Sequence, residues 1–168
     1  MTQALAETQD DLSHHAHDWD WLVGRWSVRH ARLRARLAGS TEWEEFNGTS
    51  HCWLTMGGFG TCDDNVIEIG TGTYRAMGIR AFDRATRLWS IWWLDERYPD
   101  HIEPPVRGSF ADGEGRFEGD DTLNGRPIKV RFRWTNITGA SAHWEQAFSE
   151  DGGATWEVNW RMQFTRAD

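Results

Sequence analysis

The sequence predicts an all-β fold, a closed antiparallel barrel of about ten strands. Turn residues recur roughly every eight to twelve residues between short runs that alternate apolar and polar side chains. No long segment has the period of a helix, and this combination is typical of a β-barrel or β-sandwich. The length of 168 residues suits one domain, large enough to bury a sizeable core without metals or disulfides.

Residues 1–17 are polar and rich in histidine, with little to pack on a core. We expect them to form a flexible N-terminal lead, and we assign residues 18–168 to a single barrel domain. The first clear strand is "GRWSVRHARL" (24–33), in which Trp26, Val28 and His30 alternate with smaller or polar residues. Further extended runs follow at 47–54, 72–83, 87–96, 115–121, 126–135, 142–148 and 156–164.

Two turns between these runs stand out. Asn124-Gly125 separates 115–121 from 126–135, and Asn-Gly is the strongest short signal for a β-hairpin. The stretch "SEDGGATW" (149–156) resembles the Asp-box hairpin that repeats around sialidase propellers. A propeller needs several copies, and this chain has one and is too short for six blades. We interpret the stretch as a tight hairpin turn that implies no glycosidase.

The formal net charge of −8 argues against nucleic acid and anionic membranes as partners. No stretch approaches the roughly 20 apolar residues that span a bilayer. The N-terminus has no basic region followed by an apolar run, so no signal peptide is expected. Cys52 and Cys62 form neither a CxxC pair nor a disulfide framework. Together these features predict reduced thiols and a cytoplasmic protein.

The segment "LVGRW" (22–26) resembles the Gly-x-Trp opening of calycin barrels, the group of lipocalins and fatty-acid-binding proteins. The chain also resembles an uncharacterised domain-of-unknown-function family within that group. The segments that carry this resemblance are "LVGRWSV" (22–28), "GIRAFD" (78–83), "WWLDE" (92–96), "GRPIKVRF" (125–132) and "MQFTR" (162–166). The resemblance implies a closed antiparallel barrel around a cavity, and it implies no known reaction.

The sequence departs from fatty-acid-binding proteins in two ways. They carry two helices as a lid after the first strand, and "RARLAGSTEW" (34–43) is too short for these, so no helical lid is expected. Their Arg-x-Tyr carboxylate clamp corresponds here to Arg161-Met162-Gln163, which argues against the same clamp. Haem-binding barrels share the fold, but no haem-ligand motif is found, so no cofactor is predicted.

The cavity lining follows from strand alternation, taking the face with the larger apolar residues as the inner one. The predicted ligand-binding residues are His30, His51, Trp53, Trp92, Phe132, Trp134, Trp144 and Trp160. A shift of one residue would exchange the two faces of a strand. The alternative lining is then Asp95, Arg131, Glu145 and Arg161.

The chain contains 12 Trp, 8 Phe and 2 Tyr, and such rigid side chains line cores, cavities and interfaces. The first hypothesis is a barrel that binds a small, largely apolar or aromatic molecule, oriented by His30 and His51. The second is an isomerase, cyclase or hydrolase of a hydrophobic substrate, with one of these histidines as acid or base; a carboxylate partner would favour it. The third is a structural or interaction module whose aromatic residues fill the core.

Three further stretches have weaker claims to a function. "HHAHD" (14–18) has the residue types of a metal site, but we interpret it as a solvated tail and predict no metal. "CDDNVIE" (62–68) contains carboxylates suited to acid–base work, and we interpret it as a solvated turn at the rim. "LWSIWWLD" (88–95) is apolar on both faces. Its surplus face is covered either by the N-terminal segment or by a second copy in a homodimer.

Overall fold

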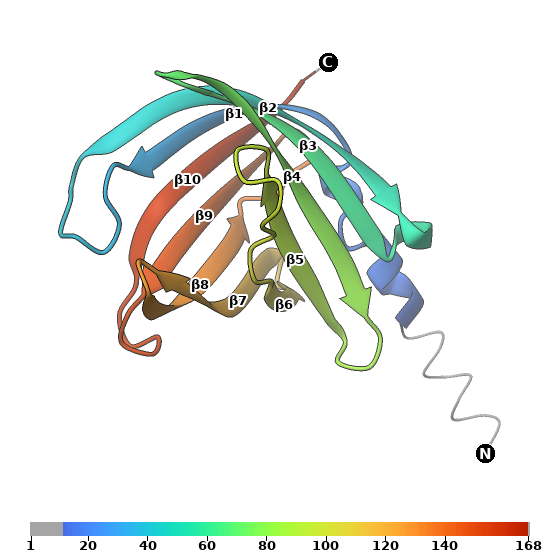
Figure 1. Ribbon diagram of the computed structural model, residues 1–168. Helices are drawn as coiled ribbons and strands as arrows, with labels where there is room; N and C mark the ends of the chain where they lie inside the picture. Colours follow the sequence, from blue (N-terminus) through green and yellow to red (C-terminus); the bar gives the residue numbers. More distant parts are fainter. Residues whose placement is uncertain (1–11, 168) are drawn as a thin grey trace.

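The computed structural model describes residues 12–167, which form a closed barrel of antiparallel strands (Figure 1). The described strands are β1 (Gly24–Leu33), β2 (Trp43–Thr55), β3 (Gly60–Ile69), β4 (Gly72–Asp83), β5 (Leu88–Asp95), β6 (Val106–Ala111), β7 (Glu114–Leu123), β8 (Arg126–Thr135), β9 (Ser141–Ser149) and β10 (Glu157–Arg166). The 3₁₀-helices are η1 (His14–His17), η2 (Asp20–Leu22) and η3 (Met56–Gly58).

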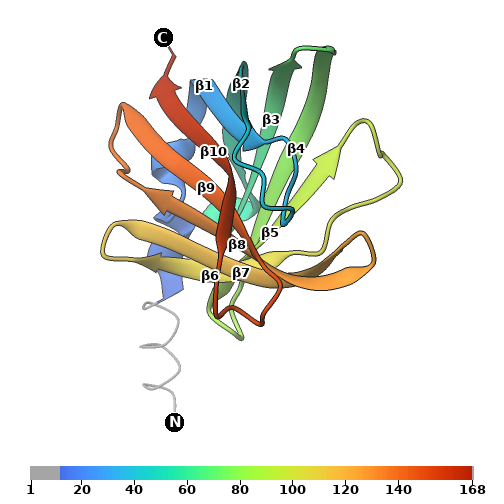
Figure 2. The same ribbon diagram turned by 90° about the vertical axis from the view of Figure 1, so that its left-hand side faces the viewer.

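The predicted fold class is confirmed. Each strand pairs with its neighbours in sequence, and β1 pairs with β10 to close the barrel (Figure 2). The segment 34–42 joins β1 directly to β2, so no helical lid covers the barrel at this point. The Asn124-Gly125 turn connects β7 to β8, and both residues have the positive φ that such a hairpin requires.

The barrel wall is weakest between β5 and β6. These strands pair over only three residue pairs, from Trp89 to Ile91 on β5. The later half of β5 continues without β6 and is held to the following segment by a single bridge between Leu94 and Ile102. The connection 96–105 therefore lies where the sheet pairing is interrupted, beside the interior of the barrel.

The N-terminal segment closes one end of the barrel. Trp19 is completely buried, and its ring contacts those of Trp89, Phe117 and Trp134 from the inner wall. Leu22 follows, and its carbonyl accepts a 2.7 Å hydrogen bond from the indole N–H of Trp26. The segment thus packs against the inner face of β5 at Trp89, whose indole also donates a hydrogen bond to Asp18.

Two sequence-based expectations remain open at this level. Residues 14–17 of the predicted lead form η1, and His15 stacks on Phe82 at 4.4 Å between ring centroids; residues 1–11 lie outside the described residues. Homodimerisation through the outer face of β5 stays a prediction.

In the part of the chain that the structure describes, no helix is long and apolar enough to cross a bilayer.

Candidate functional site

The barrel encloses a cavity of about 310 Å³. One end is closed by the N-terminal segment, whose Leu22 contributes to the cavity lining. The other end opens between the exposed side chains of Tyr98, Glu103 and Thr122, which are part of the same lining. The third hypothesis, a core filled by aromatic residues, does not match a barrel with this internal space.

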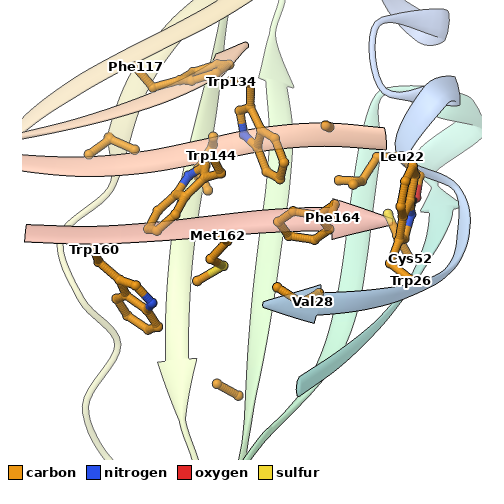
Figure 3. Close-up of a cluster of buried hydrophobic side chains, with 14 of the residues drawn as sticks. Leu22, Trp26, Val28, Cys52, Phe117, Trp134, Trp144, Trp160, Met162 and Phe164 are labelled. Atoms are coloured by element: carbon orange, nitrogen blue, oxygen red, sulfur yellow. Dashed lines mark hydrogen bonds between the residues drawn. The ribbon is translucent and has the colours of Figure 1, made fainter. Parts of the chain in front are cut away.

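One side of the cavity is an aromatic wall on β8, β9 and β10 (Figure 3). We define the aromatic wall as the rings of Phe132, Trp134, Trp144, Trp160 and Phe164 together with the side chain of Met162, which lies among them. Its rings support one another edge to face: Phe132 and Trp144 have centroids 5.0 Å apart, and Trp144 and Trp160 are 5.7 Å apart. Such contacts stabilise aromatic pairs beyond their buried area, so the wall is held in place without a ligand.

The opposite side is a polar stripe on β2, β3 and β4. We define it as Ser50, Asp63, Asn65 and Arg80, all buried and all lining the cavity. Ser50 and Asn65 are register partners across β2 and β3, and both side chains point inward. The cavity is therefore apolar on one side and rich in hydrogen-bonding groups on the other.

Asp63 and Arg80 form an ion pair at the centre of this stripe. Their exposed fractions are 3% and 7%, and Nη1 of Arg80 lies 2.5 Å from Oδ2 of Asp63. The other carboxylate oxygen accepts hydrogen bonds from the Gly78 N–H (3.0 Å) and the Asn65 side chain. A buried carboxylate with these partners is compensated in charge and in hydrogen bonding, as burial of a charge requires.

Arg80 still has donors to spare. Its two hydrogen bonds, to Asp63 and Thr61, both come from Nη1. Within the described chain, its buried Nε has no hydrogen-bond partner. The guanidinium lies over the ring of Trp19 at 4.5 Å, at the closed end of the cavity. Arg80 therefore has N–H groups without hydrogen-bond partners, next to the ring of Trp19.

Gly78 makes this arrangement possible. A Cβ at this position would lie 2.7 Å from both carboxylate oxygens of Asp63, closer than side-chain carbons approach in real proteins. The backbone of β4 can therefore approach the carboxylate and donate to it only because position 78 has no side chain.

The mouth of the cavity carries arginines stacked on aromatic rings. Arg32 donates to the Tyr74 hydroxyl at 3.4 Å, and the guanidinium of Arg97 lies 3.6 Å from the Tyr74 ring centroid. Arg97 also holds Asp95 through a hydrogen bond of 2.7 Å from Nη2. Burial alone would raise the pKa of Asp95, but the hydrogen bonds from Arg97 outweigh burial and lower it.

His30 is buried behind the aromatic wall. Its Nδ1 accepts a 3.1 Å hydrogen bond from the Trp160 indole, and its ring stacks on Phe46 at 4.7 Å. Burial, assisted by the positive charge of Arg32, lowers the pKa of His30 to about 3. His30 is therefore neutral at physiological pH and fixes the orientation of Trp160.

Four of the eight predicted site residues point into the cavity: Phe132, Trp134, Trp144 and Trp160. Trp92 borders the cavity, but its side chain shares the outer face of β5 with Leu94. His30 is inside the barrel but outside the lining. His51 and Trp53 are on the outer face of β2, where Trp53 is 38% exposed, so the predicted inner face of this strand is wrong.

Beyond Phe46, the inner face of β2 has small side chains for a steric reason. Its buried residues are Phe46, Gly48, Ser50 and Cys52. A Cβ at Gly48 would lie 2.4 Å from the Val66 carbonyl oxygen and 2.9 Å from Nε2 of His30, so the neighbouring backbone and the imidazole leave no room for a larger side chain. Choosing the face with the larger apolar residues therefore selects the wrong one.

The sequence reading missed the polar stripe. The segment 62–68, interpreted as a solvated turn, lies within β3, and Asp63 is among its most buried residues. A signal was available, because Asp63, Asn65 and Ile67 alternate with period two ahead of the Gly70–Gly72 turn into β4.

Of the alternative lining residues, Asp95 reaches the cavity, and Arg131, Glu145 and Arg161 do not.

The geometry does not supply the acid–base pair of the second hypothesis. Within the described chain, neither His30 nor His51 has a hydrogen bond to a carboxylate; His30 bonds to Trp160. No three His, Cys, Asp or Glu residues among positions 12–167 converge as a metal site would require. His15 and His17 instead bond to Asp18 and Asp20.

The stretch 149–156 forms the loop between β9 and β10. Asp151 accepts hydrogen bonds from the Thr155 N–H (2.8 Å), the Thr155 hydroxyl and the Ser149 hydroxyl (2.7 Å). Trp156 folds back and donates to the Gly153 carbonyl. These bonds, led by those from Thr155, lower the pKa of Asp151 to about 2. The loop lies outside the cavity lining and braces the hairpin.

No known family model and no curated protein matches this sequence. Among solved structures, an S-type phycobiliprotein lyase from Guillardia theta has a similar fold, with a TM-score of 0.59. The likeness covers 89% of this chain and 90% of the lyase, at 10% sequence identity. At that identity it shows a shared fold alone, and membership of the calycin group stays a prediction.

Proposed function

We propose that this barrel binds a small, largely apolar or aromatic molecule that carries at least one hydrogen-bonding group. The observation that supports this most strongly is the two-sided cavity, with the aromatic wall facing the polar stripe. Its volume is at the lower end of the range typical of small-molecule sites, which are mainly apolar with a few placed polar groups.

Each side of the cavity has its own part in this proposal. The aromatic wall supplies contact area from rigid side chains, which lose little conformational entropy when a ligand binds. The polar stripe favours a ligand that carries a hydrogen-bond acceptor. The Ser50 hydroxyl makes no hydrogen bond within the described chain, and Arg80 has N–H groups without hydrogen-bond partners. A ligand without such a group leaves these donors without partners, which costs affinity.

The fold shared with a phycobiliprotein lyase is compatible with a barrel that handles a small molecule. At 10% sequence identity the likeness gives no support for the same reaction in this chain, and within the described residues neither candidate histidine has a carboxylate partner for acid–base catalysis. Binding is therefore the function that the geometry favours.

The test is a fluorescence titration with N-phenyl-1-naphthylamine, a neutral aromatic probe that becomes fluorescent in apolar surroundings. We expect saturable uptake of one probe per chain. Val130→Phe adds a ring at a buried lining position and should abolish uptake. Thr165→Phe adds the same ring on the exposed outer face of β10 and should leave uptake unchanged. Equal uptake by both variants would place the probe outside the cavity and overturn the proposal.

A further inference from the structure

The mouth of the cavity holds two arginines without ion-pair partners. The chain has an excess of acidic residues, 26 against 18 basic ones, and most of the arginines that pair with carboxylates lie on the outer surface. Arg32 and Arg36 both line the cavity, and within the described chain neither lies within 4 Å of a carboxylate oxygen. An acidic protein thus leaves two half-buried positive charges uncompensated at one opening.

Arg32 is held in position by aromatic rings. Its guanidinium lies 5.0 Å from the ring centroid of Phe46 and 5.1 Å from that of Trp160, and it donates to the Tyr74 hydroxyl. Stacking fixes the plane of the guanidinium and leaves its edge N–H groups for a planar anion. Trp160 belongs to the aromatic wall, so a ligand on that wall lies next to Arg32.

Arg36 adds a second charge from the segment that follows β1. Its guanidinium is 5.7 Å from the ring centroid of Phe148, another residue of the cavity lining. Burial lowers the pKa of Arg36, and the charge of Arg32 lowers it further. Both guanidinium groups line the same cavity, so an anion bound there is attracted by two positive charges.

The carboxylates at the mouth do not neutralise this pair. Asp95 is held by Arg97 through both oxygens, with Nε donating to Oδ1 and Nη2 donating to Oδ2. Glu103 and Glu157 lie near Arg36, but within the described chain neither forms an ion pair with it. The positive field of Arg32 and Arg36 therefore remains available at the opening.

We infer that the ligand is an organic anion, whose carboxylate or similar acidic group is bound by Arg32 and Arg36 while its apolar body lies on the aromatic wall. This inference rests on the proposed function. Charge-assisted hydrogen bonds from guanidinium groups to planar anions are among the strongest in proteins, and both arginines present the required N–H groups.

The experiment compares two probes that differ by one anionic group. N-phenyl-1-naphthylamine is neutral, and 8-anilinonaphthalene-1-sulfonate has the same rings with a sulfonate. We expect the wild type to bind the sulfonate at least about tenfold more tightly, because a charge-assisted bond contributes at least that factor. In the double variant Arg32→Gln/Arg36→Gln this preference, measured as the ratio of the two dissociation constants, should disappear.

Two controls keep the outcomes distinct. Arg34→Gln removes one positive charge from the same segment at an exposed position outside the lining, and it should retain the preference. Arg32→Lys/Arg36→Lys keeps both charges and should retain part of it. If the neutral probe binds but the wild type shows no preference, the inference is wrong and the proposed function stands. If neither probe enters the wild type, the proposed function itself fails.

Discussion

The indole N–H of Trp160 on β10 donates a 3.1 Å hydrogen bond to Nδ1 of His30 on β1. The two strands that close the barrel are therefore joined by side chains as well as by backbone pairing. Because Nδ1 accepts, the neutral imidazole carries its proton on Nε2. This bond fixes the ring of Trp160, the member of the aromatic wall on which Arg32 stacks.

His30 gives the stability of the protein a pH dependence. The folded pKa is about 3, below the ordinary value of 6.5. Between these values the unfolded chain binds a proton that the folded chain does not, so stability falls as the pH is lowered from 6.5 towards 3. His30→Asn keeps an acceptor but does not titrate. Urea unfolding at several pH values should show a shallower slope for the variant, and identical slopes would contradict this account of His30.

Gly78→Ala should destabilise the fold by about 1–3 kcal/mol, because the new methyl group overlaps a carboxylate that three hydrogen bonds hold in place. Gly70→Ala is the matched control, since nothing lies within 4 Å of a Cβ at that position. Its change should stay within about 0.5 kcal/mol. Chemical denaturation of both variants measures the difference, and equal stabilities would show that β4 does not approach Asp63 as described.

Arg80→Met should cost about 3–5 kcal/mol, because it leaves the carboxylate of Asp63 buried without a counter-charge. Replacing the carboxylate as well, in Asp63→Leu/Arg80→Met, should recover part of this loss. A double-mutant cycle measured by urea unfolding gives the coupling. Additive losses in the double variant would mean that the two side chains do not compensate each other.

The loop of Asp151 should lose its contribution to stability in acid. The folded pKa of about 2 lies below the ordinary value of 3.8, so the carboxylate stabilises the fold above pH 3.8, and this contribution is lost as the pH falls towards 2. Asp151→Asn should therefore lower the thermal midpoint at neutral pH, and the gap to wild type should narrow in acid. A gap that stays constant with pH would assign the effect to something other than ionisation.

The barrel was predictable because its evidence is local and repeated. Alternation along 24–33, 72–83 and 126–135 gives strands with those bounds. Most connections between strands carry a glycine or asparagine with positive φ, and the β4–β5 turn and the segment 96–105 are the exceptions. The aromatic wall was predictable on β8 and β9 for the same reason. On β10 Trp160 was also predicted, although a bulge between Val158 and Trp160 breaks the alternation just before it.

The polar stripe could not be derived in the same way. Asp63 and Arg80 are buried only because they meet each other, and that partnership joins positions 17 residues apart on two strands. Considered alone, Asp63 and Arg80 are each predicted to lie on the surface, because charged side chains are rarely buried without a partner. The inner face of β2 was misassigned for a related reason, because His30 from β1 takes up the space over Gly48.

The central claim is that a ligand lies between the aromatic wall and the polar stripe. A crystal structure grown with N-phenyl-1-naphthylamine tests it most directly. The account predicts the probe inside the barrel, with its rings against Trp144 and Trp160 and its amine facing the side of Asp63 and Arg80. A probe bound on the outer surface, or an interior closed by rearranged side chains with no probe in it, would contradict the claim.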